Sequence, residues 1–155
     1  MERDMEPLPK ENSKYILYLL IVIVLLGTGL RLYCLTKEDI WYDEAVTIKA
    51  AKMGITEMVN FTLNSDVTDF PPVYYMIMKG WIGILGDSPE SVRMSSVLFG
   101  ILTILAMFYT GKELLGVKQG LFAALLMAVS PFDVTYSQEV RSYALQVLLI
   151  TLSIY

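Results

Sequence analysis

Four long stretches of this chain contain no charged residue, and they constrain its fold more than any other feature. They are Tyr15–Leu30, Met94–Gly111, Gln119–Phe132 and Ser142–Tyr155, with 16, 18, 14 and 14 residues. A helix crosses a hydrocarbon core of about 30 Å with roughly 20 apolar residues, so these stretches predict membrane-spanning helices. Hydrophobic residues make up 55% of the chain and charged residues 18%, which excludes disorder and argues against a soluble domain.

We therefore predict an all-α integral membrane protein with about four transmembrane helices. The predicted spans are residues 15–35, 93–115 and 118–136, with the start of a fourth span at 143–155. The first span follows a cytoplasmic tail of residues 1–14, and it reaches full length if Arg31 extends its charge to the lipid surface. The fourth provides only about 20 Å of helix, so we expect the chain to be a fragment that ends inside it.

The segment Pro71–Gly86 determines which loops share a face of the membrane. As a helix it is about 24 Å long, too short to span comfortably, so we predict an interfacial or re-entrant helix. Lys and Arg residues crowd residues 1–14 and the turn at 112–118, and the positive-inside rule places both in the cytoplasm. The outer loop 36–92, with its short amphipathic helices, and the outer loop 137–142 then lie on the same side.

The residue inventory excludes several kinds of chemistry. The chain has no histidine and one cysteine, which excludes Ser-His-Asp machinery, histidine-ligated zinc and an internal disulfide. Its net charge is −4, so it lacks the basic excess that nucleic-acid binding requires. Any chemistry must rest on carboxylates, arginine, lysine, tyrosine and amides.

Two acidic residues, Asp43 and Glu44, follow the aromatic cluster Ile40-Trp41-Tyr42 just outside the first span. They precede a predicted helix over Glu44–Met53, and a second short helix is predicted over Glu57–Leu63. One interpretation is structural: an N-cap and a first-turn acid that complement the helix dipole. That role needs only one acid, so a functional role stays open.

Glu139 and Arg141 lie in the predicted loop between the third and fourth spans. Tyr136, Glu139 and Tyr143 fall at helical spacing on one face. Charges this close to a membrane core are costly unless they are paired or functional. This pattern favours a function over an ordinary charged turn. Arg93, at the mouth of the second span, has the alternative role of a charge anchored at the lipid surface.

A succession of five motifs resembles one enzyme family. The motifs are Trp41–Ala45, Phe70–Tyr75, Glu90–Gly100, Ser130–Phe132 and Tyr136–Leu145. In this order they resemble the N-terminal part of polytopic GT-C glycosyltransferases, within the dolichyl-phosphate-mannose protein mannosyltransferase and aminoarabinose transferase superfamily. The resemblance covers roughly residues 30–155, and it departs from the family at Phe70, where histidine often precedes the two prolines.

The resemblance implies transfer of a sugar from a polyprenyl- or dolichyl-phosphate donor, with inversion, at the outer face of the cell membrane. The acceptor is a hydroxyl group of a protein, lipid or glycan, and the protein is multi-pass. The family pattern places the general base at Asp43, with Glu44 supporting it. It implies no cofactor, although carboxylates and water could bind Mg²⁺ or Mn²⁺.

The leaving lipid phosphate needs positive charge beside it. The first candidate is Arg141, followed by Arg93 and Lys79. Glu139 is expected to bind the sugar, to orient Arg141 or to help hold a cation. The substrate-binding set is completed by Asp69 and Tyr143. The alternative function is a truncated, non-catalytic membrane scaffold or a transporter fragment, which predicts polar residues inside the helices.

Overall fold

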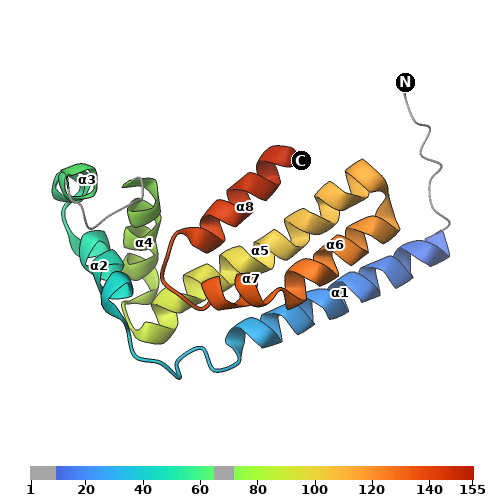
Figure 1. Cartoon of the computed structure of the whole chain (residues 1–155), viewed down its shortest axis with the longest axis horizontal. Coiled ribbons are helices and arrows are strands. Elements are labelled where there is room, and N and C mark those ends of the chain that lie inside the picture. Colours follow the sequence, from blue (N-terminus) through green and yellow to red (C-terminus); the bar gives the residue numbers. More distant parts are fainter. Residues whose placement is uncertain (1–9, 65–71) are drawn as a thin grey trace.

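The computed structural model describes residues 10–64 and 72–155, with side chains from residue 13 onward. This part of the chain consists of helices and their connections, without a strand (Figure 1). The helices are α1 (Lys10–Leu32), α2 (Tyr42–Lys52), α3 (Ile55–Asn64), α4 (Pro72–Leu85), α5 (Pro89–Leu115), α6 (Val117–Val129), α7 (Pro131–Tyr136) and α8 (Tyr143–Ile154). The predicted all-α class is confirmed.

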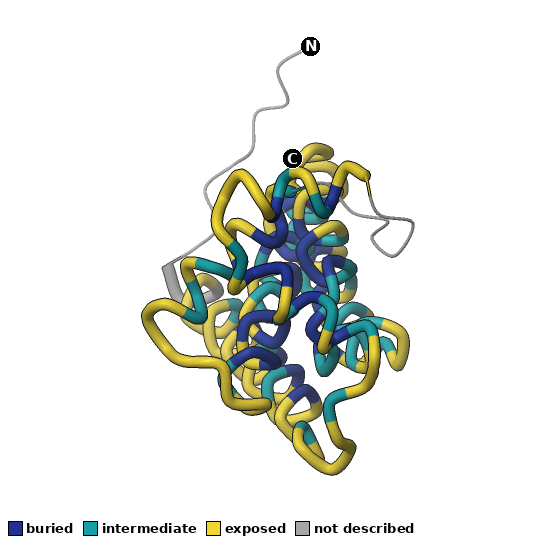
Figure 2. Tube along the Cα trace, turned by 90° about the vertical axis from the view of Figure 1, so that its left-hand side faces the viewer, coloured by how far each residue is buried: buried dark blue, intermediate teal, exposed yellow. Residues whose placement is uncertain are grey.

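Four helices, α1, α5, α6 and α8, run along the long axis of the molecule, and α2, α3 and α4 lie together at one end (Figure 1). The buried residues line the inner sides of the bundle (Figure 2). The helices α5 and α6 approach very closely at Gly120, where an added Cβ would lie 2.6 Å from the carbonyl oxygen of Phe108. Small residues allow this approach, as in many membrane bundles.

Two helices of the described chain are long and apolar enough to cross a membrane, over Ser13–Leu32 and Pro89–Leu115. The other apolar helices, α6 and α8, have 13 and 12 residues. Large side chains along α1, including Leu17, Val22 and Leu25, are exposed, as expected for a surface that contacts lipid. The structure therefore agrees with a membrane protein with two candidate spans, whereas four spans stay a prediction.

The helix predicted over residues 118–136 is divided in the structure. The helix α6 ends at Val129, and Ser130 caps α7 by accepting a hydrogen bond from the amide of Asp133. Proline at position 131 has no N–H group and is favoured at the first position of a helix. The apolar run continues through this break, which is why its composition does not reveal the division.

The helices between α1 and α5 form a layer across the end of the bundle. The predicted helices over 44–53 and 57–63 appear as α2 and α3, within three residues at each end. The helix α4 lies crosswise to the bundle (Figure 1). Gly86, with φ +82°, turns the chain from α4 into α5, and Ser88 caps α5.

Candidate active site

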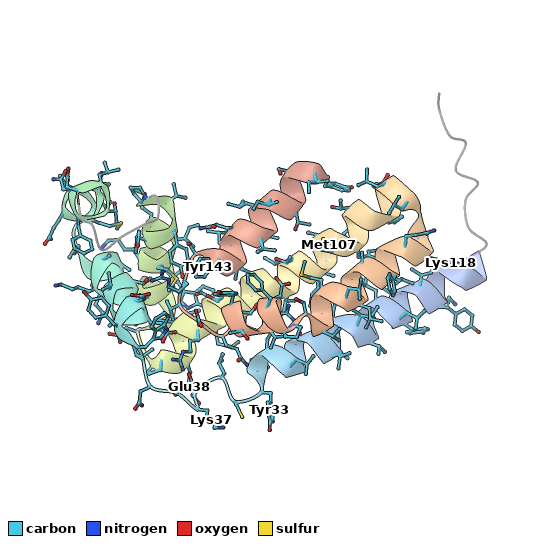
Figure 3. All side chains as sticks on the ribbon, in the orientation of Figure 1. Tyr33, Lys37, Glu38, Met107, Lys118 and Tyr143 are labelled. Atoms are coloured by element: carbon cyan, nitrogen blue, oxygen red, sulfur yellow. The ribbon has the colours of Figure 1, made fainter. Side chains whose placement is uncertain are left out.

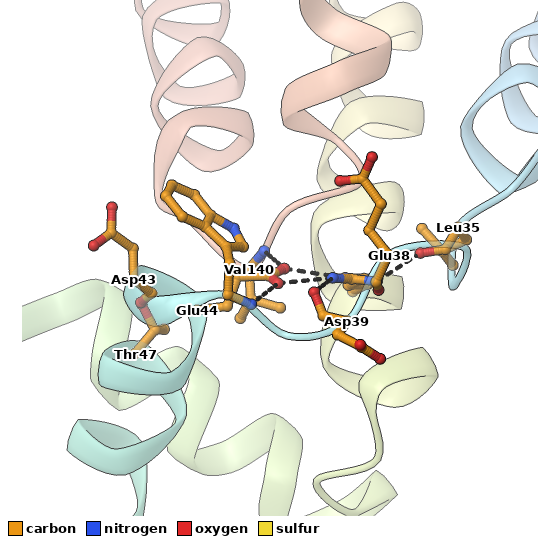
Figure 4. A network of polar contacts seen from close by, with 9 residues as sticks. Leu35, Glu38, Asp39, Asp43, Glu44, Thr47 and Val140 are labelled. Carbon is orange, nitrogen blue, oxygen red and sulfur yellow. Dashed lines mark hydrogen bonds and ion pairs between the residues drawn. The ribbon is translucent and has the colours of Figure 1, made fainter.

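The start of α2, the start of α5 and the loop between α7 and α8 meet at one end of the bundle (Figure 4). Asp43 and Glu44 both lie in the first turn of α2, whose N-cap is Trp41. The expected role of Asp43 as the N-cap is therefore wrong by two positions. Because successive helical residues differ by about 100° around the axis, the two carboxylates face different surroundings.

Glu44 is completely buried and forms an ion pair with Arg93. Its Oε1 accepts hydrogen bonds from Arg93 Nε at 3.0 Å and from the amide of Val140 at 2.9 Å. Its Oε2 accepts one from Arg93 Nη2 at 2.8 Å. Glu44 thus joins α2, α5 and the loop before α8, whereas its role in supporting Asp43 stays a prediction.

Arg93 uses its remaining donors on the segment that leads into α2. Its Nη1 donates to the carbonyls of Leu35 and Glu38, and its Nη2 donates to that of Asp39. With the two bonds to Glu44, these contacts occupy all five N–H donors of a guanidinium. In this arrangement Arg93 fixes the segment 35–44, and a lipid phosphate would have to displace one of these bonds.

Asp43 forms an ion pair with Arg141, with 2.8 Å between Oδ2 and Nη1. The two side chains are 33% and 13% exposed, so the pair is open to solvent on the side of Asp43. Arg141 lies over the rings of Trp41 and Tyr143, 5.9 Å and 5.5 Å from their centroids. The structure therefore brings three of the predicted site residues, Asp43, Arg141 and Tyr143, into one group.

Glu139 lies on the same loop and lines a pocket of about 600 Å³. Partial burial, reinforced by the nearby negative charge of Glu44, raises the pKa of Glu139 above its ordinary value. Trp41 also lines this pocket, and the Trp41 ring contacts Arg141 as well. The pocket is thus adjacent to the ion pair of Asp43.

Lys79 does not join this group. Its amino group donates at 2.6 Å to the carbonyl of Met53, at the carboxyl end of α2, and lies 3.5 Å from the carbonyl oxygen of Ala51. Residue 51 lies about 12 Å along the helix axis from Asp43. Asp69, the remaining member of the predicted set, lies outside the described residues.

The sequence interpretation missed the role of Arg31. The expectation that this side chain reaches the lipid surface is wrong, because it is completely buried. Its Nε donates to Ser137 Oγ, and its Nη atoms donate to the carbonyls of Gly27, Met127 and Ala128. An arginine in an apolar stretch is itself the signal that could have found this role, since buried membrane charges are usually paired or functional.

The loop that carries Arg141 is also tied to the end of α1 by Gln138. Its amide Nε2 donates to the carbonyls of Leu30, Arg31 and Tyr33. The loop is therefore fixed by α1 on one side and by Glu44 on the other. Residues 137–142 do not form the helix that the spacing of Tyr136, Glu139 and Tyr143 indicated. The rings of Tyr136 and Tyr143, which flank this loop, are nevertheless in contact, with 4.7 Å between their centroids.

The described part of the chain contains no group of three or more Asp, Glu, Cys or His side chains arranged to hold a metal ion. The two carboxylates of the first turn of α2 are each paired with an arginine: Glu44 with Arg93, and Asp43 with Arg141. That the reaction needs no cofactor stays a prediction.

A comparison with protein families matches residues 69–155 to dolichyl-phosphate-mannose-protein mannosyltransferases, which is 87 of the 155 residues. The match includes Arg93, Glu139 and Arg141, whereas Asp43 and Glu44 precede it. Neither the curated proteins nor the solved structures gave a match. The family match does not favour the alternative of a truncated, non-catalytic membrane scaffold or a transporter fragment. Together with the apolar helices, it shows that this chain belongs to the dolichyl-phosphate-mannose-protein mannosyltransferase family of membrane glycosyltransferases.

Proposed function

We propose that this protein takes part in transferring a sugar from a polyprenyl- or dolichyl-phosphate donor to an acceptor hydroxyl. The reaction takes place at the outer face of the cell membrane, in a multi-pass protein. The observation that carries the proposal is the ion pair between Asp43 and Arg141 at the end of the bundle. It provides a proton acceptor and a cation next to a pocket whose lining includes charged side chains.

The reaction balances with these two groups. The acceptor oxygen attacks the anomeric carbon of the donor sugar while Asp43 takes the hydroxyl proton. The bond between the anomeric carbon and the phosphate oxygen breaks, and the lipid phosphate leaves with the electron pair. Arg141 stabilises the negative charge that develops on that phosphate. Attack opposite to the leaving group inverts the configuration of the anomeric carbon.

The geometry also implies a step before the chemistry. Asp43 Oδ2 and Arg141 Nη1 are in direct contact. A donor phosphate competes with Asp43 for the guanidinium, since arginine binds phosphate and carboxylate in the same forked geometry. Donor binding therefore releases the carboxylate for the acceptor hydroxyl, while the buried pair of Glu44 and Arg93 keeps the site in shape.

A transfer assay with membranes that contain the complete protein tests this proposal. The donor is a synthetic short-chain polyprenyl-phosphate mannose, and nucleotide-linked mannose is the control donor. We expect transfer from the lipid-linked donor only, with inverted configuration in the product by NMR. Transfer from the nucleotide-linked donor alone, or a product with retained configuration, would contradict the proposed mechanism.

The role of Arg141 is tested with the same assay. Arg141→Gln removes a charged hydrogen-bond donor to the leaving phosphate, so we expect kcat/KM for the lipid-linked donor to fall about tenfold to hundredfold. The matched control is Lys112→Gln, a basic residue at the opposite end of α5, which should leave the rate near that of the wild type. Equal rates for the Arg141 variant and the wild type would exclude this residue from the phosphate site.

A further inference from the structure

The pocket beside the ion pair is distinct from the pair itself. It has a volume of about 600 Å³, within the range of ligand sites. Neither Asp43 nor Arg141 lines it. Trp41 is the shared wall, because its ring contacts Arg141 and also borders the pocket. A ligand in this pocket thus lies one aromatic ring away from the proposed base and cation.

The charges of the pocket disfavour a phosphate ligand. Two carboxylates, Glu38 and Glu139, line it. The guanidinium of Arg93 also borders it, but its five donors are bound to Glu44 and to backbone carbonyls. Lys37 is the remaining cation of the lining. The phosphate of a donor therefore fits better at Arg141, outside this pocket.

The same residues suit a ring that carries hydroxyl groups. The carboxylates of Glu38 and Glu139 accept hydrogen bonds from hydroxyls, and the hydroxyl of Thr135 can donate or accept. Trp41 is 47% exposed, and its ring offers a flat apolar surface for the C–H face of a sugar ring, with polar groups around it. The described residues contain no metal-binding cluster that would make the carboxylates a cation site.

We propose that this pocket binds a pyranose ring, packed on Trp41 and hydrogen-bonded by Glu38, Glu139 and Thr135. The inference rests on the proposed function, because it assigns the sugar-binding part of the same site. The ring belongs either to the lipid-linked donor or to a glycan acceptor, which share this chemistry.

Cys34 provides a readout that does not depend on activity. This residue is exposed, unpaired and part of the pocket lining. The experiment measures the alkylation rate of Cys34 by N-ethylmaleimide, by mass spectrometry, in the complete protein in nanodiscs. We expect methyl α-mannopyranoside to slow alkylation in a saturable manner, whereas glycerol at the same concentration should not. An unchanged rate at all sugar concentrations would overturn the proposal.

A pair of neighbouring acids supplies the matched variants. The backbone carbonyls of Glu38 and Asp39 both accept a hydrogen bond from Arg93, but of these two residues only Glu38 lines the pocket. We expect Glu38→Gln to weaken the protection of Cys34 about tenfold in sugar concentration, and Asp39→Asn to leave it unchanged. Equal protection in the two variants would also overturn the proposal.

Further arms identify the source of the ring and separate this inference from the proposed function. If Glu38→Gln raises KM for the lipid-linked donor, the pocket holds the donor sugar; if it raises KM for the acceptor alone, the pocket holds the acceptor. Both results support a pyranose site. Asp43→Asn should abolish transfer and retain the protection of Cys34. If Asp43→Asn abolishes transfer but the sugar does not protect Cys34 from alkylation even in the wild type, the pocket proposal is refuted and the proposed function stands.

Discussion

Asp43 and Glu44 are adjacent in sequence, yet their surroundings give them different tasks. The Glu44 side chain is 0% exposed and receives hydrogen bonds from three segments. Asp43 is one-third exposed and pairs with a single arginine. A carboxylate that must take a proton from a substrate needs access to that substrate. The structure gives this access to Asp43 alone of the two.

We expect Glu44→Gln to act on stability first. The amide keeps the shape of the side chain but loses the charge, and its NH₂ group cannot accept from the donors that face it. Breaking a buried ion pair on one side costs about 3–5 kcal/mol. Thermal unfolding in detergent measures the loss. The control, Glu57→Gln on the exposed face of α3, should change stability by less than about 0.5 kcal/mol. Equal unfolding temperatures for the two variants would contradict the structural role.

Glu139 should give the protein a recognisable pH dependence. Burial raises its pKa in the folded state, with the charge of Glu44 adding to the effect. The unfolded chain therefore releases this proton first as the pH rises, and the folded state is destabilised relative to it. From about pH 4 upward, the free energy of unfolding should fall through the window between the two pKa values.

The variant Glu139→Gln isolates this contribution. Glutamine cannot titrate, so only the wild type loses stability through this pH window. The free energy of unfolding of the variant minus that of the wild type should therefore increase as the pH rises, and it should level off above the raised pKa of Glu139. Unfolding midpoints measured in a series of buffers give this difference. A difference that is constant with pH would show that Glu139 titrates as an ordinary surface carboxylate.

Among the helices, the sequence was most informative where charge ends an apolar run. It predicted the first and second long helices and the two short helices of the outer layer, because polar residues bound each of them. It missed the break at Ser130-Pro131, where apolar residues continue on both sides, although a proline inside a helical pattern is itself a signal for a helix end. The burial of Arg31 follows from this break. Residue 131 would supply the amide that bonds the carbonyl of Met127 in a continuous helix, but proline has none.

Arg31 supplies the missing donors at this break. Its Nη2 donates to the carbonyl of Met127, and its Nη1 to that of Ala128. The candidate site was predictable as a set of charges near the membrane surface. Its pairing was not, because Asp43 and Arg141 are separated by 97 residues and meet only through the loop that Arg31 and Gln138 hold.

A double-variant cycle tests this explanation of Arg31. Arg31→Met leaves buried carbonyls without donors, at a cost of about 1–3 kcal/mol each. Adding Pro131→Ala restores an amide for the carbonyl of Met127, so the double variant should recover about 1 kcal/mol of the loss. Thermal unfolding of the four proteins provides the cycle. Additive effects of the two substitutions would contradict the link between the helix break and the buried arginine.

The two ends of the helix bundle are predicted to lie on opposite sides of the membrane, and cysteine labelling can test this. Lys118 lies toward the end opposite Lys37 and Glu38 (Figure 3). We expect an impermeant thiol reagent to label Cys34 and Thr135→Cys from outside, and Gln119→Cys only after permeabilisation. Labelling of residues 119 and 135 from the same side would refute the proposed arrangement.

The most direct test of Asp43 as the base is the rate of Asp43→Asn in the complete enzyme. Asparagine keeps the shape, and Asp43 is not the N-cap, so the substitution removes a first-turn charge, about 0.3–1 kcal/mol. It also removes the partly exposed ion pair with Arg141, about 0.2–1 kcal/mol. Loss of general-base catalysis should lower kcat about 10²–10⁴-fold, with folding nearly intact. Donor binding should be retained or become tighter, because the carboxylate that competes with the donor phosphate for Arg141 is gone. A variant that folds and retains more than about a third of the wild-type kcat would contradict this role, because the expected effect is far larger.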